Sequence, residues 1–181
     1  MGTERDAKYY DAFMRNAEYR QHYSTCWYFY MWKIVLRQIK KDARILEVGC
    51  GTGQFAEMLF DSGFDKKKYH GFDFSSAGIE WCMRLGDMFS VGNALDAKQY
   101  DHDYDTVVCL EVLEHINQDI ELLQNIKIGT TMIVSVPESD DPSHVRAFLT
   151  EESVRERYSN SIDIQKVQWY GHRHIFTGIK K

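Results

Sequence analysis

The sequence contains little proline and few cysteines. Its 181 residues include two prolines, twelve glycines and four cysteines. So little proline and glycine argues against a disordered or linker-like chain. Cys26, Cys50, Cys82 and Cys109 lie far apart and form no CxxC pair. Their spacing argues against a framework of structural disulfides and indicates a reducing compartment.

The sequence also lacks a long hydrophobic run and a strong basic patch. Its most apolar run, residues 26–32, is far too short to span a bilayer. The polar and charged segment of residues 1–11 does not resemble a signal peptide. We therefore expect a soluble, cytoplasmic protein. The formal net charge is −5, and the one lysine/arginine cluster is residues 66–68, which argues against nucleic acid as a partner.

From residue 44 onward, apolar segments typical of strands alternate with segments typical of helices. Near-continuous apolar strands separated by helices form a mostly parallel sheet that is covered on both faces. We therefore predict a doubly wound α/β fold of about seven strands, the last of them antiparallel. The expected strands are residues 44–48, 69–73, 88–91, 104–110, 131–136, 162–169 and 174–179, and the expected helices are residues 54–61, 75–84, 113–125 and 151–158.

The segment of residues 7–40 lacks proline and glycine and is rich in aromatic residues. We predict one or two helices there, with Trp32, Leu36 and Ile39 on one face. This aromatic stripe either packs on the sheet or forms a lid over an active site. The whole chain, residues 1–181, is thus predicted to be one domain. Residues 1–40 would form a helical cover, and residues 41–181 would form the sheet that binds cofactor and carries catalysis.

A glycine-rich loop, EVGCGTG at residues 47–53, follows the first expected strand. Its alternating glycines allow a tight turn and a close approach to a ligand, and the next helix offers free backbone N–H groups. A dinucleotide fingerprint would place a further glycine at position 54, which is Gln54. The carboxylate of Glu47 would repel a pyrophosphate but would favour the ammonium and sulfonium of S-adenosylmethionine. The loop therefore favours the methyl donor over a nucleotide cofactor.

Four segments in order resemble the motifs of the class I S-adenosylmethionine-dependent methyltransferases. They are ILEVGCGTGQF, YHGFDFS, VGNAL and YDTVVCLEVLEHI. The resemblance implies that Asp73 binds both ribose hydroxyls, with Phe74 against the adenine. It further implies that Asn93 and Ala94 lie at the adenine edge and that the backbone of Leu110 lies near the methionine part. The implied cofactor-binding residues are Glu47, Gly49, Cys50, Gly51, Gly53, Asp73, Phe74, Asn93, Ala94 and Leu110.

Three polar residues, Glu111, Glu114 and His115, follow the strand expected at residues 104–110. If a helix begins there, their spacing of i, i+3 and i+4 places all three on one face. Such a group can act as an acid/base cluster or as ligands of a divalent ion. It can also be a helix start that favours acidic residues, with His115 packed beneath the cofactor.

A later histidine, His144, lies in the loop after the strand expected at residues 131–136. This arrangement resembles the O-methyltransferases of ubiquinone biosynthesis and the small-RNA terminal 2′-O-methyltransferases. The resemblance implies a divalent metal ion held by Glu111, Glu114, His115 and His144. The segment HVRAFLTEE is one residue shorter than in the ubiquinone enzymes. The RNA branch has a second histidine where this chain has Ile116, which argues against RNA.

We therefore expect methyl transfer from S-adenosylmethionine to a hydroxyl of a small molecule. The expected catalytic residues are His115, Glu111 and Glu114, with a divalent metal ion as a second cofactor to be tested. Catalysis would come mainly from holding donor and acceptor in line, while His115 or a metal-activated hydroxyl handles the proton. Two alternatives remain open: a nucleotide-cofactor oxidoreductase and a non-catalytic S-adenosylmethionine-binding module. The sequence names neither the acceptor nor the oligomeric state.

Overall fold

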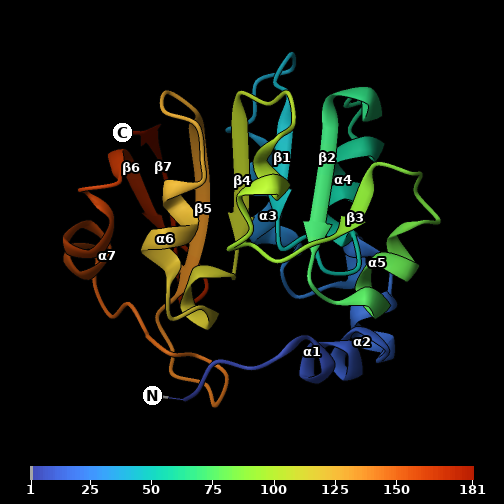
Figure 1. The fold of residues 1–181 in the computed structure, drawn as a ribbon, viewed down its shortest axis with the longest axis horizontal. Helices are drawn as coiled ribbons and strands as arrows, with labels where there is room; N and C mark the ends of the chain where they lie inside the picture. Colours follow the sequence, from blue (N-terminus) through green and yellow to red (C-terminus); the bar gives the residue numbers. More distant parts are fainter. Residues whose placement is uncertain (1) are drawn as a thin grey trace.

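The computed structural model describes residues 2–181. One seven-stranded sheet has the strand order β3-β2-β1-β4-β5-β7-β6 (Figure 1). Strands β1 to β5 are parallel to one another, whereas β7 is antiparallel to both β5 and β6. This confirms the predicted doubly wound, mostly parallel sheet. The strands are β1 (Ile45–Val48), β2 (Tyr69–Asp73), β3 (Phe89–Val91), β4 (Thr106–Leu110), β5 (Thr131–Pro137), β6 (Ile162–Trp169) and β7 (Arg173–Lys180).

Helices cover both faces of the sheet and so create two hydrophobic cores. Successive side chains of a strand point to opposite faces, so β1 contributes Leu46 and Val48 to the core under α6 and α7, and Ile45 to the core under α3, α4 and α5. The α-helices are α1 (Ala7–Met14), α2 (Ala17–Arg20), α3 (Phe29–Leu36), α4 (Gln54–Asp61), α5 (Ser76–Cys82), α6 (Asp119–Gln124) and α7 (Glu151–Tyr158). The 3-10 helices are η1 (Tyr23–Thr25), η2 (Lys66–Lys68), η3 (Ala97–Tyr100) and η4 (Leu113–His115).

The aromatic N-terminal segment forms three α-helices, which lie in two different places relative to the sheet. Helix α3 packs on the sheet with Met31, Trp32 and Val35 buried, as the packing interpretation expects. Helices α1 and α2 lie instead beyond the carboxyl ends of the parallel strands (Figure 1). Helix α1 begins at a capping residue: Asp6 accepts a hydrogen bond from the backbone N–H of Tyr9.

The predicted helix over residues 113–125 is wrong. The structure has η4, a break, and then α6. The side chain of Arg146 explains the break, because its guanidinium donates to the carbonyl oxygens of Ile116 at 2.6 Å and Asn117 at 3.1 Å. In a continuous helix those carbonyls would accept from backbone N–H groups four residues later. A residue outside the segment thus ends the first turn.

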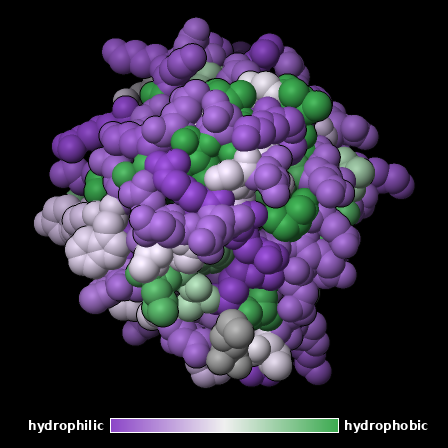
Figure 2. Space-filling model, turned by 90° about the vertical axis from the view of Figure 1, so that its left-hand side faces the viewer, coloured by the Kyte–Doolittle hydropathy of each residue, from purple (hydrophilic) through white to green (hydrophobic). Residues whose placement is uncertain are grey.

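The outer strand β6 presents polar side chains along the edge of the sheet. Asp163, Gln165 and Lys166 are exposed, and this side of the molecule is mainly hydrophilic with scattered apolar residues (Figure 2). Charged residues on an edge strand oppose pairing with another chain.

The state of the four cysteines and the lengths of the helices bear on two expectations from the sequence. Cys26, Cys50, Cys82 and Cys109 are all buried free thiols, which agrees with the absence of a disulfide framework. Among residues 2–181, no helix is both long enough and apolar enough to cross a membrane.

Candidate active site

A cavity of about 470 Å³ lies at the carboxyl ends of the parallel strands, under α1 and α2. Ligands of doubly wound sheets bind at this edge. All of the residues predicted to bind cofactor line the cavity except Gly53. Gly53 is instead the N-cap of α4, with a φ of 76°. The lining residues among those predicted are Glu47, Gly49, Cys50, Gly51, Asp73, Phe74, Asn93, Ala94 and Leu110.

The glycine-rich loop is held against the end of β2. The backbone N–H groups of Gly49 and Cys50 donate to the carbonyl oxygen of Phe72 at 2.9 and 3.1 Å. Gly49 has a φ of 73°, and a Cβ there would overlap the side chain of Val112. Only glycine fits this position without strain, so the loop can run close to the cavity.

Asp73, at the end of β2, has a carboxylate that organises the surrounding backbone. It accepts hydrogen bonds from the N–H groups of Gly51 at 2.9 Å and Ser75 at 2.8 Å. Burial raises the pKa of Asp73 above its usual value. Each carboxylate oxygen keeps a further lone pair, so Asp73 can also accept from hydroxyl groups of a ligand in the cavity.

Glu47 lies in β1, and its carboxyl group lines the same cavity with only 3% of the residue exposed. The hydroxyl of Tyr69 donates a hydrogen bond to it. Burial raises the pKa of Glu47 to about 8. A cationic ligand in the cavity would favour the ionised form and lower that pKa.

Helix α1 is fastened to the rest of the site by Asp11. The Asp11 carboxylate accepts from the Ser75 hydroxyl at 2.6 Å and from the backbone N–H of Ala77 at 3.0 Å. This places the Tyr10 ring between two predicted site residues, with ring centroids 5.2 Å from Phe74 and 5.6 Å from His115. The position agrees with the lid interpretation of this part of the aromatic segment.

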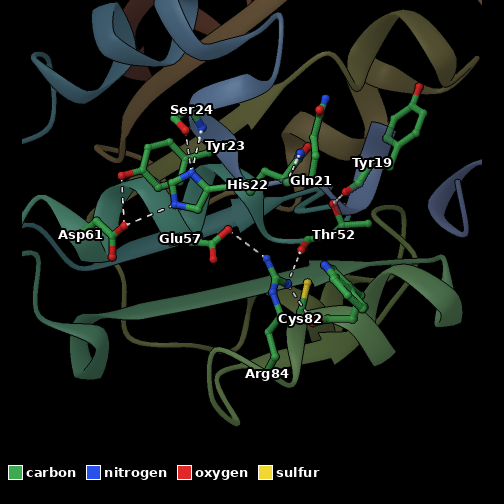
Figure 3. Close-up of polar contacts among 12 residues, drawn as sticks. Tyr19, Gln21, His22, Tyr23, Ser24, Thr52, Glu57, Asp61, Cys82 and Arg84 are labelled. Carbon is green, nitrogen blue, oxygen red and sulfur yellow. Dashed lines mark hydrogen bonds and ion pairs between the residues drawn. The ribbon is translucent and has the colours of Figure 1, made fainter. Parts of the chain in front are cut away.

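Further contacts fasten α2 and the following segment to the glycine-rich loop. The hydroxyl of Thr52 donates to the carbonyl oxygen of Tyr19, and the guanidinium of Arg84 donates to the carbonyl oxygen of Thr52 at 3.0 Å (Figure 3). Arg84 is held in turn by Glu57 at 3.0 Å. The loop is therefore held by the cover on one side and, on the other, by Arg84 just after α5, which Glu57 of α4 supports.

Three potential metal ligands, Glu114, His115 and His144, converge at the cavity. Each offers a ligand atom, and these atoms all lie within 4.8 Å of one another. The Glu114 carboxylate is fully buried, and neither of its oxygens has a hydrogen-bond partner in the described part of the chain. Nε2 of His115 lies 3.6 Å from it. Burial, together with the nearby negative charge of Glu111, raises the pKa of Glu114 well above its usual range.

The two histidines of this cluster are oriented by backbone carbonyls. Nδ1 of His115 lies 3.0 Å from the carbonyl oxygen of Ser143, and Nδ1 of His144 lies 3.0 Å from that of Ser139. A carbonyl can only accept, so each Nδ1 carries the hydrogen and each Nε2 is left as an acceptor. Metal-binding histidines have this kind of support. Burial lowers the pKa of His115 to about 4, which keeps its imidazole neutral.

Glu111 does not join this cluster. The prediction that Glu111, Glu114 and His115 project from one helical face is wrong, because no α-helix forms there and Glu111 has a φ of 58°. Its carboxylate accepts from Nε of Arg173 at 2.7 Å and from the hydroxyl of Ser135 at 2.7 Å. The structure therefore brings together three of the four residues that the resemblance implied as ligands.

Arg173 lines the cavity, and sequence reasoning did not find it. It begins β7, which runs antiparallel to β5 and pairs Arg173 with Pro137. The amino end of an antiparallel strand meets the carboxyl ends of its parallel neighbours at one sheet edge. The predicted hairpin therefore carried a partial signal, since it places the start of its second strand at the sheet edge that holds the site, although that strand was expected to begin at residue 174, one residue after Arg173.

The chain is similar in sequence to known methyltransferases. The sequence model of a family described as "Methyltransferase domain" matches residues 17–178. The chain is 29% identical over 90 residues to a ubiquinone biosynthesis O-methyltransferase of Rickettsia bellii, covering 47% of this chain and 36% of that protein. It is 29% identical over 119 residues to the Rickettsia felis protein of the same name, covering 61% and 48%. The chain thus spans less than half the length of these curated relatives.

Solved structures share the fold over nearly the whole chain. A Haloferax volcanii protein, solved in complex with a methyltransferase activator, has a TM-score of 0.75 at 15% identity, covering 97% of this chain and 98% of that one. An S-adenosylmethionine-dependent methyltransferase of Aquifex aeolicus has a TM-score of 0.69 at 12% identity, covering 98% and 100%. The chain therefore belongs to the methyltransferase domain family and has the fold of the S-adenosylmethionine-dependent enzymes.

Proposed function

We propose that the chain transfers a methyl group from S-adenosylmethionine to a hydroxyl group of a small molecule. The observation that carries the proposal is one cavity shared by the glycine-rich loop, Asp73 and the cluster of Glu114, His115 and His144. Family membership supports methyl transfer and argues against the oxidoreductase alternative. The distant ubiquinone O-methyltransferases support a hydroxyl acceptor.

The residues present fit the methyl donor. S-adenosylmethionine supplies an electrophilic methyl group and brings two positive charges when it is bound. Among residues 2–181 no cationic side chain bonds to the buried carboxyl group of Glu47, so an ammonium nearby would stabilise its ionised form. Asp73 retains acceptor capacity for hydroxyls. Phe74 and the segment of Asn93 and Ala94 line the same cavity and are assigned to the adenine.

The residues present also fit a divalent metal ion. Such an ion, when bound, lowers the pKa of a hydroxyl and fixes its position. The Glu114 carboxylate and Nε2 of both His115 and His144 would hold it. A buried carboxylate without a partner is costly, and an ion would provide the missing partner. Two imidazoles and one carboxylate suit zinc or a mid-row transition metal better than calcium, which prefers oxygen ligands.

A metal-free form of the same function uses His115 alone. Its Nε2 is free to accept a proton from the acceptor hydroxyl, as a general base does. This form leaves the buried oxygens of Glu114 without a partner, so we favour the metal-dependent form.

Calorimetry tests the cofactor assignment. S-adenosylhomocysteine should bind to the purified chain, and NAD⁺ should not. The reverse result would support the oxidoreductase alternative. Incubation with S-adenosylmethionine and a panel of hydroxylated aromatics and sugars, followed by mass spectrometry, then tests turnover. Binding of S-adenosylhomocysteine without any methylated product would support the non-catalytic binding module.

Chelation tests the metal once an acceptor is found. A chelator should abolish turnover, and added Zn²⁺, Mn²⁺ or Co²⁺ should restore it. Glu114→Gln and His144→Gln should each lose turnover, whereas the control His172→Gln changes an exposed histidine outside the cluster. If the chelator has no effect and only a substitution of His115 is severe, the metal-free form is correct.

A further inference from the structure

The two glutamates beside the cavity have opposite environments. Glu114 is fully buried, and no group among residues 2–181 forms a hydrogen bond with either of its oxygens. Both oxygens of Glu111 have donors, namely Nε of Arg173 at 2.7 Å and the hydroxyl of Ser135 at 2.7 Å. Of the two carboxylates, only that of Glu114 lacks a partner.

The backbone fixes the direction of the Glu111 side chain. Glu111 has a φ of 58°, a region that non-glycine residues rarely adopt. Its N–H donates to the carbonyl oxygen of Ser135 at 3.1 Å and lies 3.1 Å from the Ser135 hydroxyl oxygen. These hydrogen bonds to β5 hold Glu111 in its strained backbone conformation. In that conformation its carboxylate lies against the guanidinium of Arg173.

Arg173 is itself held on several sides. Its Nη1 donates to the carbonyl oxygen of Gly171 at 2.8 Å. Its guanidinium carbon lies 5.3 Å from the ring centroid of Trp27 and 4.7 Å from that of Tyr28, within the range of cation–π contact. Its side chain is only 19% exposed. The guanidinium is therefore a fixed partner for Glu111.

We propose that Arg173 is a positioning residue that keeps Glu111 out of the metal-ligand set, so that three protein groups hold the ion. The inference rests on the proposed function. An ion held by Glu114, His115 and His144 keeps coordination positions open for an acceptor oxygen, as catalytic metal sites do. A second carboxylate would fill one of those positions. Arg173 thus sets the number of protein ligands without touching the ion.

Cobalt binding tests this inference without any acceptor. The whole chain is stripped with a chelator and titrated with Co²⁺, and the visible absorption bands report affinity and coordination number. Glu114→Gln should weaken Co²⁺ binding by at least about 100-fold, because it removes a ligand. Glu111→Gln should leave the Kd nearly unchanged, because Glu111 bonds to Arg173 and Ser135 and to none of the three ligands.

Arg173→Met gives the positive test. The freed carboxylate of Glu111 should join the ion, tighten Co²⁺ binding by about tenfold and change the absorption spectrum. The gain should vanish in the double variant Arg173→Met, Glu111→Gln. Arg173→Lys serves as the matched control, since it keeps the positive charge beside Glu111. If Arg173→Met fails to fold, the comparison of Glu111→Gln with Glu114→Gln still tests whether Glu111 lies outside the ligand set.

Different failures point to different errors. If Glu111→Gln weakens Co²⁺ binding as much as Glu114→Gln, the inference is wrong while the metal site stands. A gain in affinity that persists in the double variant also overturns it. If the wild-type chain binds S-adenosylhomocysteine but no Co²⁺, both the inference and the metal are wrong, while cofactor binding stands.

Discussion

The carboxylate of Asp73 accepts a hydrogen bond from the backbone N–H of Gly51 at 2.9 Å, which ties the end of β2 to the glycine-rich loop. The residue assigned to the cofactor ribose therefore also shapes the loop around the cofactor. Loss of this carboxylate should affect both the affinity for cofactor and the stability of the protein.

Asp73→Ala should weaken S-adenosylhomocysteine binding by at least about tenfold, because charge-assisted hydrogen bonds to the ribose are lost. It should also destabilise the apo protein by about 1–3 kcal/mol, since the buried N–H groups of Gly51 and Ser75 lose their acceptor. Calorimetry and urea unfolding measure the two effects. Asp73→Asn keeps one acceptor oxygen and should destabilise less. Unchanged affinity in both variants would remove Asp73 from the cofactor site.

Glu47 should make the apo protein less stable as pH rises. Its pKa is raised from an ordinary value of 4.5 to about 8 in the folded state. Below pH 4.5 both states are protonated and the contribution to stability is fully present. Between pH 4.5 and 8 the unfolded state ionises first, so this contribution is lost as pH rises through the window. Urea unfolding across pH 5–8 should show the decline, and Glu47→Gln should flatten it. Equal slopes for both proteins would contradict the prediction.

Cofactor binding should release a proton from Glu47 near pH 7. The carboxyl group is neutral in the apo protein below pH 8, and a bound ammonium and sulfonium favour its ionised form. Titration of S-adenosylmethionine in buffers of different ionisation enthalpy counts the protons released. Glu47→Gln should abolish the release. A wild-type binding heat that does not depend on the buffer would rule the ionisation out.

Asp11→Ala should loosen the cover without unfolding the sheet. The carboxylate bonds to the Ser75 hydroxyl and to the N–H of Ala77 at the start of α5, and loss of a hydrogen bond costs about 0.5–1.5 kcal/mol. Limited trypsin digestion should then cut faster at Arg15 and Arg20, and S-adenosylhomocysteine should slow the cleavage. Glu18→Ala, an exposed change in α2, is the control. If Asp11→Ala and the control are cut at the same rate, Asp11 does not anchor the cover.

Asp119→Ala should be among the most destabilising substitutions in the chain. The buried carboxylate bonds to Arg157 at 2.6 and 3.0 Å and to the hydroxyl of Tyr158 at 2.9 Å, with Arg146 at 3.2 Å. Removing one partner of a buried ion pair costs about 3–5 kcal/mol. Thermal and urea unfolding measure the loss. Asp163→Ala, on the exposed edge of β6, should stay within about 0.5 kcal/mol of wild type.

Local patterns in the sequence predicted the sheet well because each signal lies within one segment. The apolar run over residues 106–110 and the glycines of residues 49–53 specify a buried strand and a tight turn without help from elsewhere. The expected limits agree with the structure for β2 and β6 and differ by at most two residues for the other strands, which reflects fraying at element ends.

The missed features depend on residues far apart in the sequence. Arg146 ends the turn at residues 113–115 from about thirty residues away, and no periodicity within residues 113–125 records that contact. Glu111 and Arg173 lie 62 positions apart in the sequence and form an ion pair. The i, i+3 spacing, which suggested a common helical face for Glu111 and Glu114, does not reveal this contact. The meeting of Glu114 and His115 with His144 was expected only from family resemblance.

The place of β7 between β5 and β6 has a consequence for synthesis on the ribosome. Both neighbours are translated before β7, so β5 leaves the exit tunnel with one row of backbone N–H and C=O groups unpaired. Unlike β6, with its charged outer side chains, the buried strand β5 carries no guard against pairing with another chain. A nascent chain that stops at residue 172 would therefore tend to aggregate through β5. Pairing of residues 173–180 with β5 and β6 completes the sheet and places Arg173 at the site in the same step.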